Sequence, residues 1–284
     1  MEAQEKIQFG KHISSKTKLL DFNLKQLWKY RDLISLFIKR DIITYYKQTI
    51  LGPLWYLISP IISTIIYMIV FGNLAHLGTD GIPQPLFYFG GTMLWTFFSE
   101  CLIKTSNVFI TNKGIFGKVY FPRLTVPIAD IIVLIIKLTI QFCLFAIVYG
   151  VYLYKGVPIR ISFMIIFFPL LVLWLGLLAG GMGLVISSIT TKYRDLIMVL
   201  SFLVSLVMYA TPVVYPLSQI PGQMKILFYL NPVSAPIELF RLIFFQAGEI
   251  PVWNCIYSLL ITSLFCFFGL ILFRQNEKKF VDVI

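Results

Sequence analysis

The chain has 284 residues, of which 58% are hydrophobic and 13% are charged, and its formal net charge is +11. Because soluble domains carry about 25% charged residues, this composition excludes an ordinary soluble domain. Apolar runs of about 20 residues are long enough to cross a bilayer, and in lipid they must be helices. The basic excess then indicates contact with membrane lipids rather than with nucleic acid. We predict an all-α integral membrane protein.

The first 50 residues form a basic arm. Between residues 24 and 46, apolar side chains recur at helical spacing, which predicts an amphipathic helix lying in the membrane interface. Leu36 and Ile43 interrupt its polar face and offer a docking surface. The helix is expected to break at Gly52 and Pro53, since proline is tolerated in the first turn of the span that follows. The expected apolar face is Leu24, Leu27, Trp28, Ile34, Ile38, Ile42 and Tyr45, and the expected polar face is Lys25, Lys29, Asp32, Arg40 and Lys47.

Six apolar segments are expected to cross the membrane, at about 54–71, 86–110, 126–154, 161–189, 196–210 and 252–273. An even number of spans puts both termini on one side. Eighteen Lys and Arg residues fall on the side of the termini and four on the other, so both termini are predicted to be cytoplasmic. The expected divisions are a cytoplasmic arm at 1–50, a transmembrane domain at 51–273 and a cytoplasmic tail at 274–284.

Residues 211–251 contain six of the 14 prolines. Two apolar pieces lie between these prolines, at about 224–230 and 237–246, and each is too short to span. We predict a re-entrant helical hairpin between spans five and six, on the outer side. Irregular backbone at that depth needs cover from protein or a water-filled cavity, which suggests an external gate. The alternative is an amphipathic pair of helices on the outer surface.

Several charged residues fall inside or near the predicted spans. Glu100 and Lys104 are four residues apart and can pair along one helix. Lys104 and Asp130 can also reach the cytoplasmic interface. Lys137 lies about 11 residues into its span, and ionisable groups at such depth usually face a cavity or a partner. Lys137 is therefore a candidate for lining a substrate path.

The hexapeptide KYRDLI occurs twice, at residues 29–34 and 192–197, and both copies fall on the predicted cytoplasmic side. Their flanking sequences do not match, so we infer no duplicated domain. Two readings stay open, independent interfacial anchors and contacts to a cytosolic partner. The sequence lacks a phosphate-binding loop, an HExxH motif, a GxSxG motif and clustered carboxylates, and its cysteines and two histidines are isolated. The energy for any work must come from a gradient or from another chain, and no metal site is expected.

Several motifs together resemble those of the membrane subunits of bacterial polysaccharide ABC exporters, the type-2 ABC permeases that export O-antigen, teichoic acid or capsule. The resemblance covers nearly the whole chain from about residue 22. The motifs are WKYRDLISLFIKRDIITYYKQTILGPLWYLISP at 28–60, YFGGTMLWTFF at 88–98, KVYFPRLTVP at 118–127, KYRDLI at 192–197, TPVVYP at 211–216, NPVSAPIELFR at 231–241 and the terminal KKFVDVI.

This resemblance implies the transmembrane subunit of an ATP-driven exporter that moves lipid-linked polysaccharide across the bacterial plasma (inner) membrane. It implies a transport subunit rather than an enzyme, with no cofactor on this chain and with ATP and Mg on a separate ATPase. The expected partners are a second copy of the chain, two ATPase copies, the lipid-linked polysaccharide and membrane lipids, without nucleic acid. A coupling helix is expected within residues 112–123.

Candidate residues follow from these roles. Arg and Lys suit a lipid diphosphate headgroup, and aromatic faces suit a sliding sugar chain. The candidates for the substrate path or headgroup are Arg31, Arg40, Arg194, Lys137, Glu100, Lys104, Tyr88, Trp95, Phe97 and Phe98. The candidates for ATPase contact are Lys29, Tyr30, Asp32, Lys118, Tyr120, Arg123, Tyr193 and Asp195. The candidates for the gate are Tyr209, Pro212, Tyr215, Pro216, Asn231 and Pro232.

Three other functions would make different demands on the sequence. A type-2 ABC exporter of another lipid or drug would share the architecture. An integral membrane enzyme acting on lipid-linked sugars would need a carboxylate or histidine cluster, which the sequence lacks. A secondary transporter would predict inverted repeats and paired broken helices, and neither is found.

Overall fold

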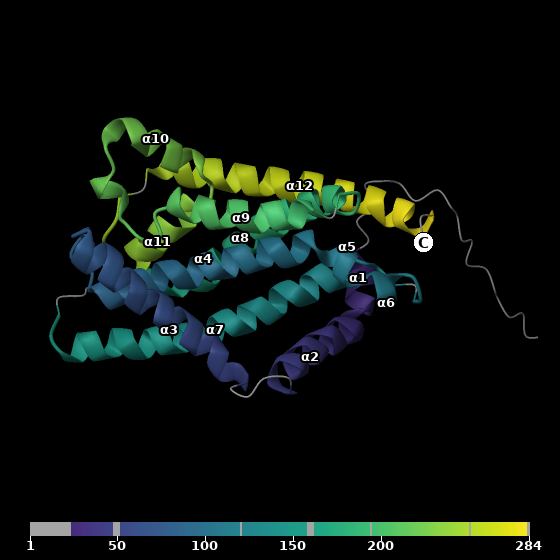
Figure 1. The fold of residues 1–284 in the computed structure, drawn as a ribbon, viewed down its shortest axis with the longest axis horizontal. Coiled ribbons are helices and arrows are strands. Elements are labelled where there is room, and N and C mark those ends of the chain that lie inside the picture. Colours follow the sequence, from purple (N-terminus) through teal and green to yellow (C-terminus); the bar gives the residue numbers. More distant parts are fainter. Residues whose placement is uncertain are drawn as a thin grey trace, which may run out of the picture.

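The computed structural model describes residues 24–47, 52–119, 121–157, 162–193, 195–249 and 251–282. All regular secondary structure in these ranges is helical, which confirms the all-α prediction. The long helices run side by side along one axis, with α10 and α11 at one end and α1, α5 and α6 toward the other (Figure 1). Arg194 and Tyr120 lie outside the described residues, as do the first 23 residues of the predicted arm.

Five helices of the described chain are long and apolar enough to cross a membrane. They agree with five of the six predicted spans to within a few residues at most ends. These five are α3 continued by the π-helix η2 (Trp55–Leu74), α4 (Gln84–Ser106), η3 with α8 (Phe163–Thr190), α7 (Thr125–Tyr154) and the apolar part (Val252–Glu277) of α12 (Val252–Asp282).

The fifth predicted span corresponds to α9 (Leu196–Tyr209), which is apolar but has only 14 residues. The proline-rich segment forms α10 (Gly222–Leu230) and α11 (Ser234–Phe245), two helices that meet at an angle of 103°. Helix α10 ends before Asn231, and the residue after Asn231 is a proline. The bend follows from this sequence, since a proline disfavours helical conformation in the residue before it and cannot donate a backbone hydrogen bond. The predicted division into two short helices is therefore found in the structure.

The helix predicted between residues 24 and 46 is divided at Tyr30 into α1 (Leu24–Lys29) and α2 (Arg31–Lys47). The side of α2 that packs against the rest of the chain centres on Phe37, which is buried, and on Asp41. Arg40 also turns toward this side, although the periodicity placed it on the polar face. Trp28, expected on the apolar face, is 71% exposed. Tertiary contacts of Phe37 and Asp41 therefore outweigh the amphipathic pattern.

The described residues form two separate hydrophobic clusters. The larger one, here called the main core, joins α4, α7, α8 and α11 through stacked and edge-on rings. The smaller one, here called the Phe273 cluster, gathers Phe37, Phe109, Phe116, Phe121 and Phe273 from α2, α5 (Val108–Thr111), α6 (Lys113–Phe116), the segment after it and α12. The main core holds the long helices together. The Phe273 cluster holds the short helices at the end of the molecule away from α10 and α11 (Figure 1).

Glycines let α8 lie close to two neighbours. A Cβ atom at Gly181 would lie 2.8 Å from the backbone nitrogen of Cys266 in α12, and one at Gly183 would lie 2.6 Å from Cβ of Thr105 in α4. Side chains at these positions would push the helices apart, which is the usual reason for small residues between membrane helices. Helices α4, α8 and α12 therefore form a tightly packed unit.

Candidate functional site

A cavity of about 350 Å³ lies between α3, α4 and α9. We call it the serine groove. Three of its residues are aromatic (Tyr67, Trp95 and Tyr209), three are serines (Ser99, Ser201 and Ser205), and the others are Ile103, Val204 and Met208. All nine of these described lining residues are uncharged.

The three serine hydroxyls donate to backbone carbonyls of their own helices. Ser99 donates to the carbonyl of Thr96 at 3.0 Å, Ser201 to that of Ile197 at 2.9 Å, and Ser205 to that of Ser201 at 3.0 Å. This local bonding is common for serine inside helices, and it leaves the oxygen lone pairs as acceptors. The serine groove therefore offers hydroxyl acceptors beside aromatic faces.

The predicted aromatic candidates divide between two places. Trp95 and Tyr209 line the serine groove. Tyr88, Phe97 and Phe98 are buried in the main core, where the ring of Tyr88 packs edge-on against that of Phe87. Sequence reasoning missed the serines, because single serines in apolar helices carry no spacing signal.

The charged residues of α4 find partners on α7. Lys137 forms an ion pair with Glu100, and its ammonium lies 5.4 Å from the centre of the Tyr56 ring. Lys104 forms an ion pair with Asp130 at 3.5 Å. The prediction of pairing along α4 therefore missed these cross-helix partners, which tertiary register rather than sequence spacing brings together.

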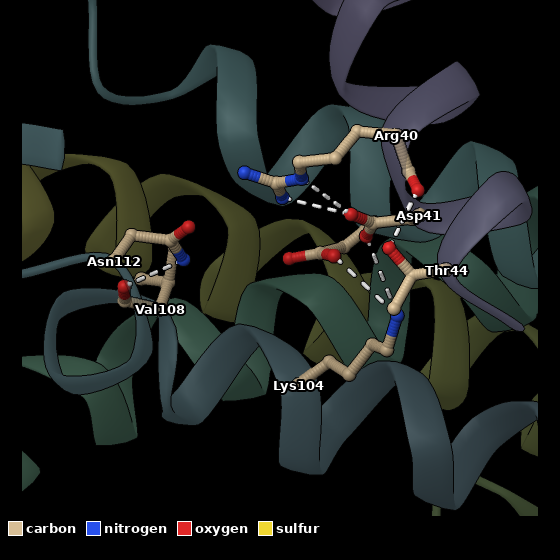
Figure 2. A network of polar contacts seen from close by, with 7 residues as sticks. Arg40, Asp41, Thr44, Lys104, Val108 and Asn112 are labelled. Carbon is tan, nitrogen blue, oxygen red and sulfur yellow. Dashed lines mark hydrogen bonds and ion pairs between the residues drawn. The ribbon is translucent and has the colours of Figure 1, made fainter. Parts of the chain in front are cut away.

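Four charged side chains connect α2 to α4 and α7, and we call them the α2 node (Arg40, Asp41, Lys104 and Asp130). The Nε and Nη2 atoms of Arg40 each lie 2.8 Å from Oδ1 of Asp41. The ammonium of Lys104 lies 3.9 Å from Oδ2 of Asp41 (Figure 2). Helix α2 is thus tied to the long helices by charge as well as by Phe37.

The remaining candidates of both hexapeptide copies are mostly exposed at the same end of the molecule. Lys29, Arg31 and Asp32 are exposed, Tyr30 is half-buried, and Tyr193 and Asp195 are exposed. Thr190, just before the second copy, donates to the carbonyl of Ser106 at 2.7 Å, which places this copy beside the end of α4. Exposed side chains of both signs therefore gather near α1, α5 and α6.

In its described residues, the segment expected to hold a coupling helix, 112–123, contains one short helix, α6, which directly follows α5. Lys118 is exposed after α6, whereas Arg123 is only 6% exposed. The backbone N–H of Arg123 donates to Oε1 of Glu277 at 3.2 Å, and its Nη1 donates to the Glu277 carbonyl at 2.9 Å. In this structure Arg123 fastens the segment to the end of α12, and Lys118 is the candidate that faces outward.

The gate candidates surround the turn between α9 and α10. Pro212 and Pro216 are buried, Pro232 is half-buried, and the Tyr215 hydroxyl donates to the carbonyl of Tyr209. The amide of Asn231 donates to the hydroxyl of Thr211 at 2.7 Å and to the carbonyl of Ala210 at 3.1 Å. Asn231 therefore ties the junction of α10 and α11 to the end of α9.

A buried ion pair lies beneath this turn, and sequence reasoning did not identify it. Arg241 is one of the four Lys and Arg residues that the sequence assigns to the outer side, but it is 2% exposed, and Glu238 is fully buried. Arg241 pairs with Glu238, donates to the carbonyl of Val213 at 3.2 Å, and lies 4.0 Å from the centre of the Phe87 ring. The spacing of three residues between Glu238 and Arg241 in an apolar helix was the available signal.

Comparison with known proteins gives the family. The profile described as ABC-2 type transporter matches residues 32–245. The O-antigen export system permease protein RfbA of Myxococcus xanthus is 25% identical over 226 residues, covering 78% of this chain and 84% of that protein. RfbA of Klebsiella pneumoniae is 22% identical, covering 93% and 98%, and the polysialic acid transport protein KpsM of Escherichia coli is 24% identical, covering 84% and 91%. The chain therefore belongs to the ABC-2 type transporter family.

Proposed function

We propose that this chain is the membrane-spanning permease of an ATP-driven exporter that moves a lipid-linked polysaccharide out of the cytoplasm across the plasma membrane. Its family and its similarity along most of its length to O-antigen and polysialic acid export proteins support this function. The chain acts as a transport subunit, and ATP and Mg bind on a separate ATPase.

The serine groove is the structural observation that most supports a polysaccharide as the transported substrate. A sugar chain offers many hydroxyl groups and apolar ring faces, and the groove offers hydroxyl acceptors and aromatic rings. Its described lining residues are uncharged, so no single strong contact would hold a moving chain. Many weak hydrogen bonds permit sliding, because each is worth only about 0.5–1.5 kcal/mol net.

We further propose six spans, with α9 as the fifth, and cytoplasmic termini. Basic residues favour this orientation, since most of them lie on the side of the termini. The 14 residues of α9 cover about 21 Å at 1.5 Å per residue, so the turn at 210–216 completes the crossing. The α10–α11 hairpin is then a re-entrant element at the outer surface, and Asn231 and Tyr215 tie it to α9 as an external gate.

The proposed assembly contains two copies of this chain and two copies of the ATPase, in the inner membrane of a bacterium. Exposed Lys29, Arg31 and Lys118 support an electrostatic contact with the ATPase and with lipid headgroups at the cytoplasmic surface. The proposed divisions are the arm at 1–50, the transmembrane domain at 51–273 and the tail at 274–284.

Deletion of the gene tests this function in the cell. We expect surface polysaccharide to disappear and lipid-linked glycan to accumulate inside, with both restored by the wild-type gene. The gene that carries Ser201→Leu should restore less export than the wild-type gene, by up to about tenfold, because leucine fills the groove and removes a hydrogen-bond acceptor. The matched control is Ser263→Leu, whose exposed hydroxyl in α12 also donates within its own helix, to the carbonyl of Leu259 at 2.9 Å. Unchanged surface polysaccharide after deletion would contradict the proposed function.

A further inference from the structure

The α2 node is built from two pairs that belong to different parts of the chain. Arg40 and Asp41 both lie on α2, and their contacts are short, at 2.8 Å. Lys104 lies on α4 and Asp130 on α7, and they pair at 3.5 Å. Each pair is neutral by itself, so each part carries its own charge balance.

The ion pair that links Arg40–Asp41 to Lys104–Asp130 is the longest of the three ion pairs in the node. The Lys104 ammonium and Oδ2 of Asp41 are 3.9 Å apart (Figure 2). The side chains of Lys104 and Asp41 are 27% and 18% exposed, so the protein does not fully enclose either of them. An ion pair with this geometry and exposure is a weak link compared with a short, fully buried one.

Parting of the two pairs would leave each charge with a partner. Asp41 would keep Arg40, and Lys104 would keep Asp130. The usual barrier to opening an ion pair, an unpaired buried charge, is therefore absent from this step.

Apolar side chains of α2 hold it against the Phe273 cluster, with Phe37 buried at their centre and Leu33, Ile34 and Ile38 partly buried beside it. Phe37 is 5% exposed, and its ring lies 5.7 Å from that of Phe121 in the Phe273 cluster. On the opposite side of α2, Leu36 is 60% exposed and Lys39 is exposed. Helix α2 is thus attached by an apolar side that centres on Phe37 and by a separable charged contact one turn later.

We propose that the α2 node is a coupling joint. Helix α2 shifts against α4 and α7 during transport by releasing Asp41 from Lys104, and Lys104 is the positioning residue that returns α2 to its place. The proposal rests on the proposed function for the force that moves α2, since the ATPase would dock at this end. The joint itself is a property of this chain and can be tested without the ATPase.

Hydrogen exchange of the full-length chain in lipid nanodiscs tests the joint. Asp41→Asn should speed exchange of the 37–47 amides about threefold to tenfold while leaving α4 and α7 unchanged, because Lys104 keeps Asp130. Lys104→Met should speed exchange in α2 and at the α4–α7 contact, whereas Lys104→Arg should keep both protected. The matched control is Asp32→Asn, the same change on the same helix at a side chain that is 96% exposed, and it should leave residues 37–47 unchanged. Unchanged exchange in Asp41→Asn would overturn the joint.

Export in cells tests the coupling. The readout is surface polysaccharide divided by the amount of this chain in the membrane, because a purely structural defect would lower the amount and leave the ratio intact. We expect Asp41→Asn and Lys104→Met to lower the ratio at least about threefold, and Lys104→Arg and the exposed Lys39→Gln to preserve it. Faster α2 exchange with an unchanged ratio would overturn the coupling role. If deletion of the gene leaves surface polysaccharide intact, the proposed function and the coupling role fail together, and the exchange result still decides whether the joint exists.

Discussion

Two charged clusters in the described part of the chain lie at opposite ends of α4 and are built in different ways. Arg241 packs on Phe87 in the first turn of α4, and Lys104 belongs to its last turn. The Glu238–Arg241 pair is almost fully buried, comes from one helix, and holds backbone carbonyls of the neighbouring turn. The α2 node is partly exposed and is divided between two separable parts.

Charge has a different structural role at each end of α4. A buried pair that also satisfies backbone carbonyls fixes one arrangement, because losing either partner strands a charge away from water. The partly exposed α2 node can separate into its two ion pairs at a low cost in free energy, because each charge keeps a partner. The structure therefore places a rigid charged support beneath the α10–α11 hairpin and an adjustable one beneath α2.

The largest effect is expected at the rigid cluster. Arg241→Met should lower the free energy of unfolding by about 3–5 kcal/mol, because Glu238 stays buried without its cation and the carbonyl of Val213 loses a donor. Thermal unfolding of the purified chain in nanodiscs measures the change. The double variant Glu238→Gln with Arg241→Met should lose less than the sum of the single variants. Additive losses would show that the two side chains do not act as a pair.

An intermediate effect is expected deeper between α4 and α7. Lys137→Met removes the partner of Glu100 and the cation beside the Tyr56 ring, and it should cost about 2 kcal/mol. The cost is smaller than at Arg241 because Glu100 is 35% exposed. The conservative variant Lys137→Arg keeps the charge and should retain most of the stability in the same unfolding measurement. A loss in Lys137→Met as large as that in Arg241→Met would erase the contrast drawn from burial.

The smallest effect is expected at the α2 node. Asp41→Asn should change the free energy of unfolding of the whole chain by less than about 1 kcal/mol, since Lys104 keeps Asp130 and Arg40 is 39% exposed on its side chain. The unfolding curve of Asp32→Asn in nanodiscs serves as the zero reference. A global loss of 3 kcal/mol or more in Asp41→Asn would mean that the node is a rigid anchor rather than an adjustable support.

Much of the fold could be predicted from the sequence, because hydropathy and length act locally. Five apolar runs predicted five long helices, and the prolines predicted the division between α10 and α11. The fifth predicted span, 196–210, was the shortest of the six, and the corresponding helix α9 has 14 residues. The family could be recognised from motifs such as the one at residues 28–60, and the match over 32–245 agrees.

The partners of charged side chains could not be predicted in the same way. Helical periodicity says which residues share a face, but not which neighbour that face meets. Lys104 and Glu100 pair with α7 because the two helices are packed in a particular register. Phe37 and Asp41 face the long helices because the Phe273 cluster and Lys104 lie there, and Arg241 is buried because α11 folds back against α4.

The most direct test of the proposed function is the ATPase activity of the purified complex. The chain would be co-expressed with its candidate ATPase, reconstituted in nanodiscs, and assayed with Mg-ATP in the presence and absence of lipid-linked glycan. We expect a stable complex whose ATP hydrolysis is stimulated by the glycan and not by the lipid carrier alone. Failure of any ATPase to associate, or hydrolysis that is indifferent to the glycan, would contradict polysaccharide export.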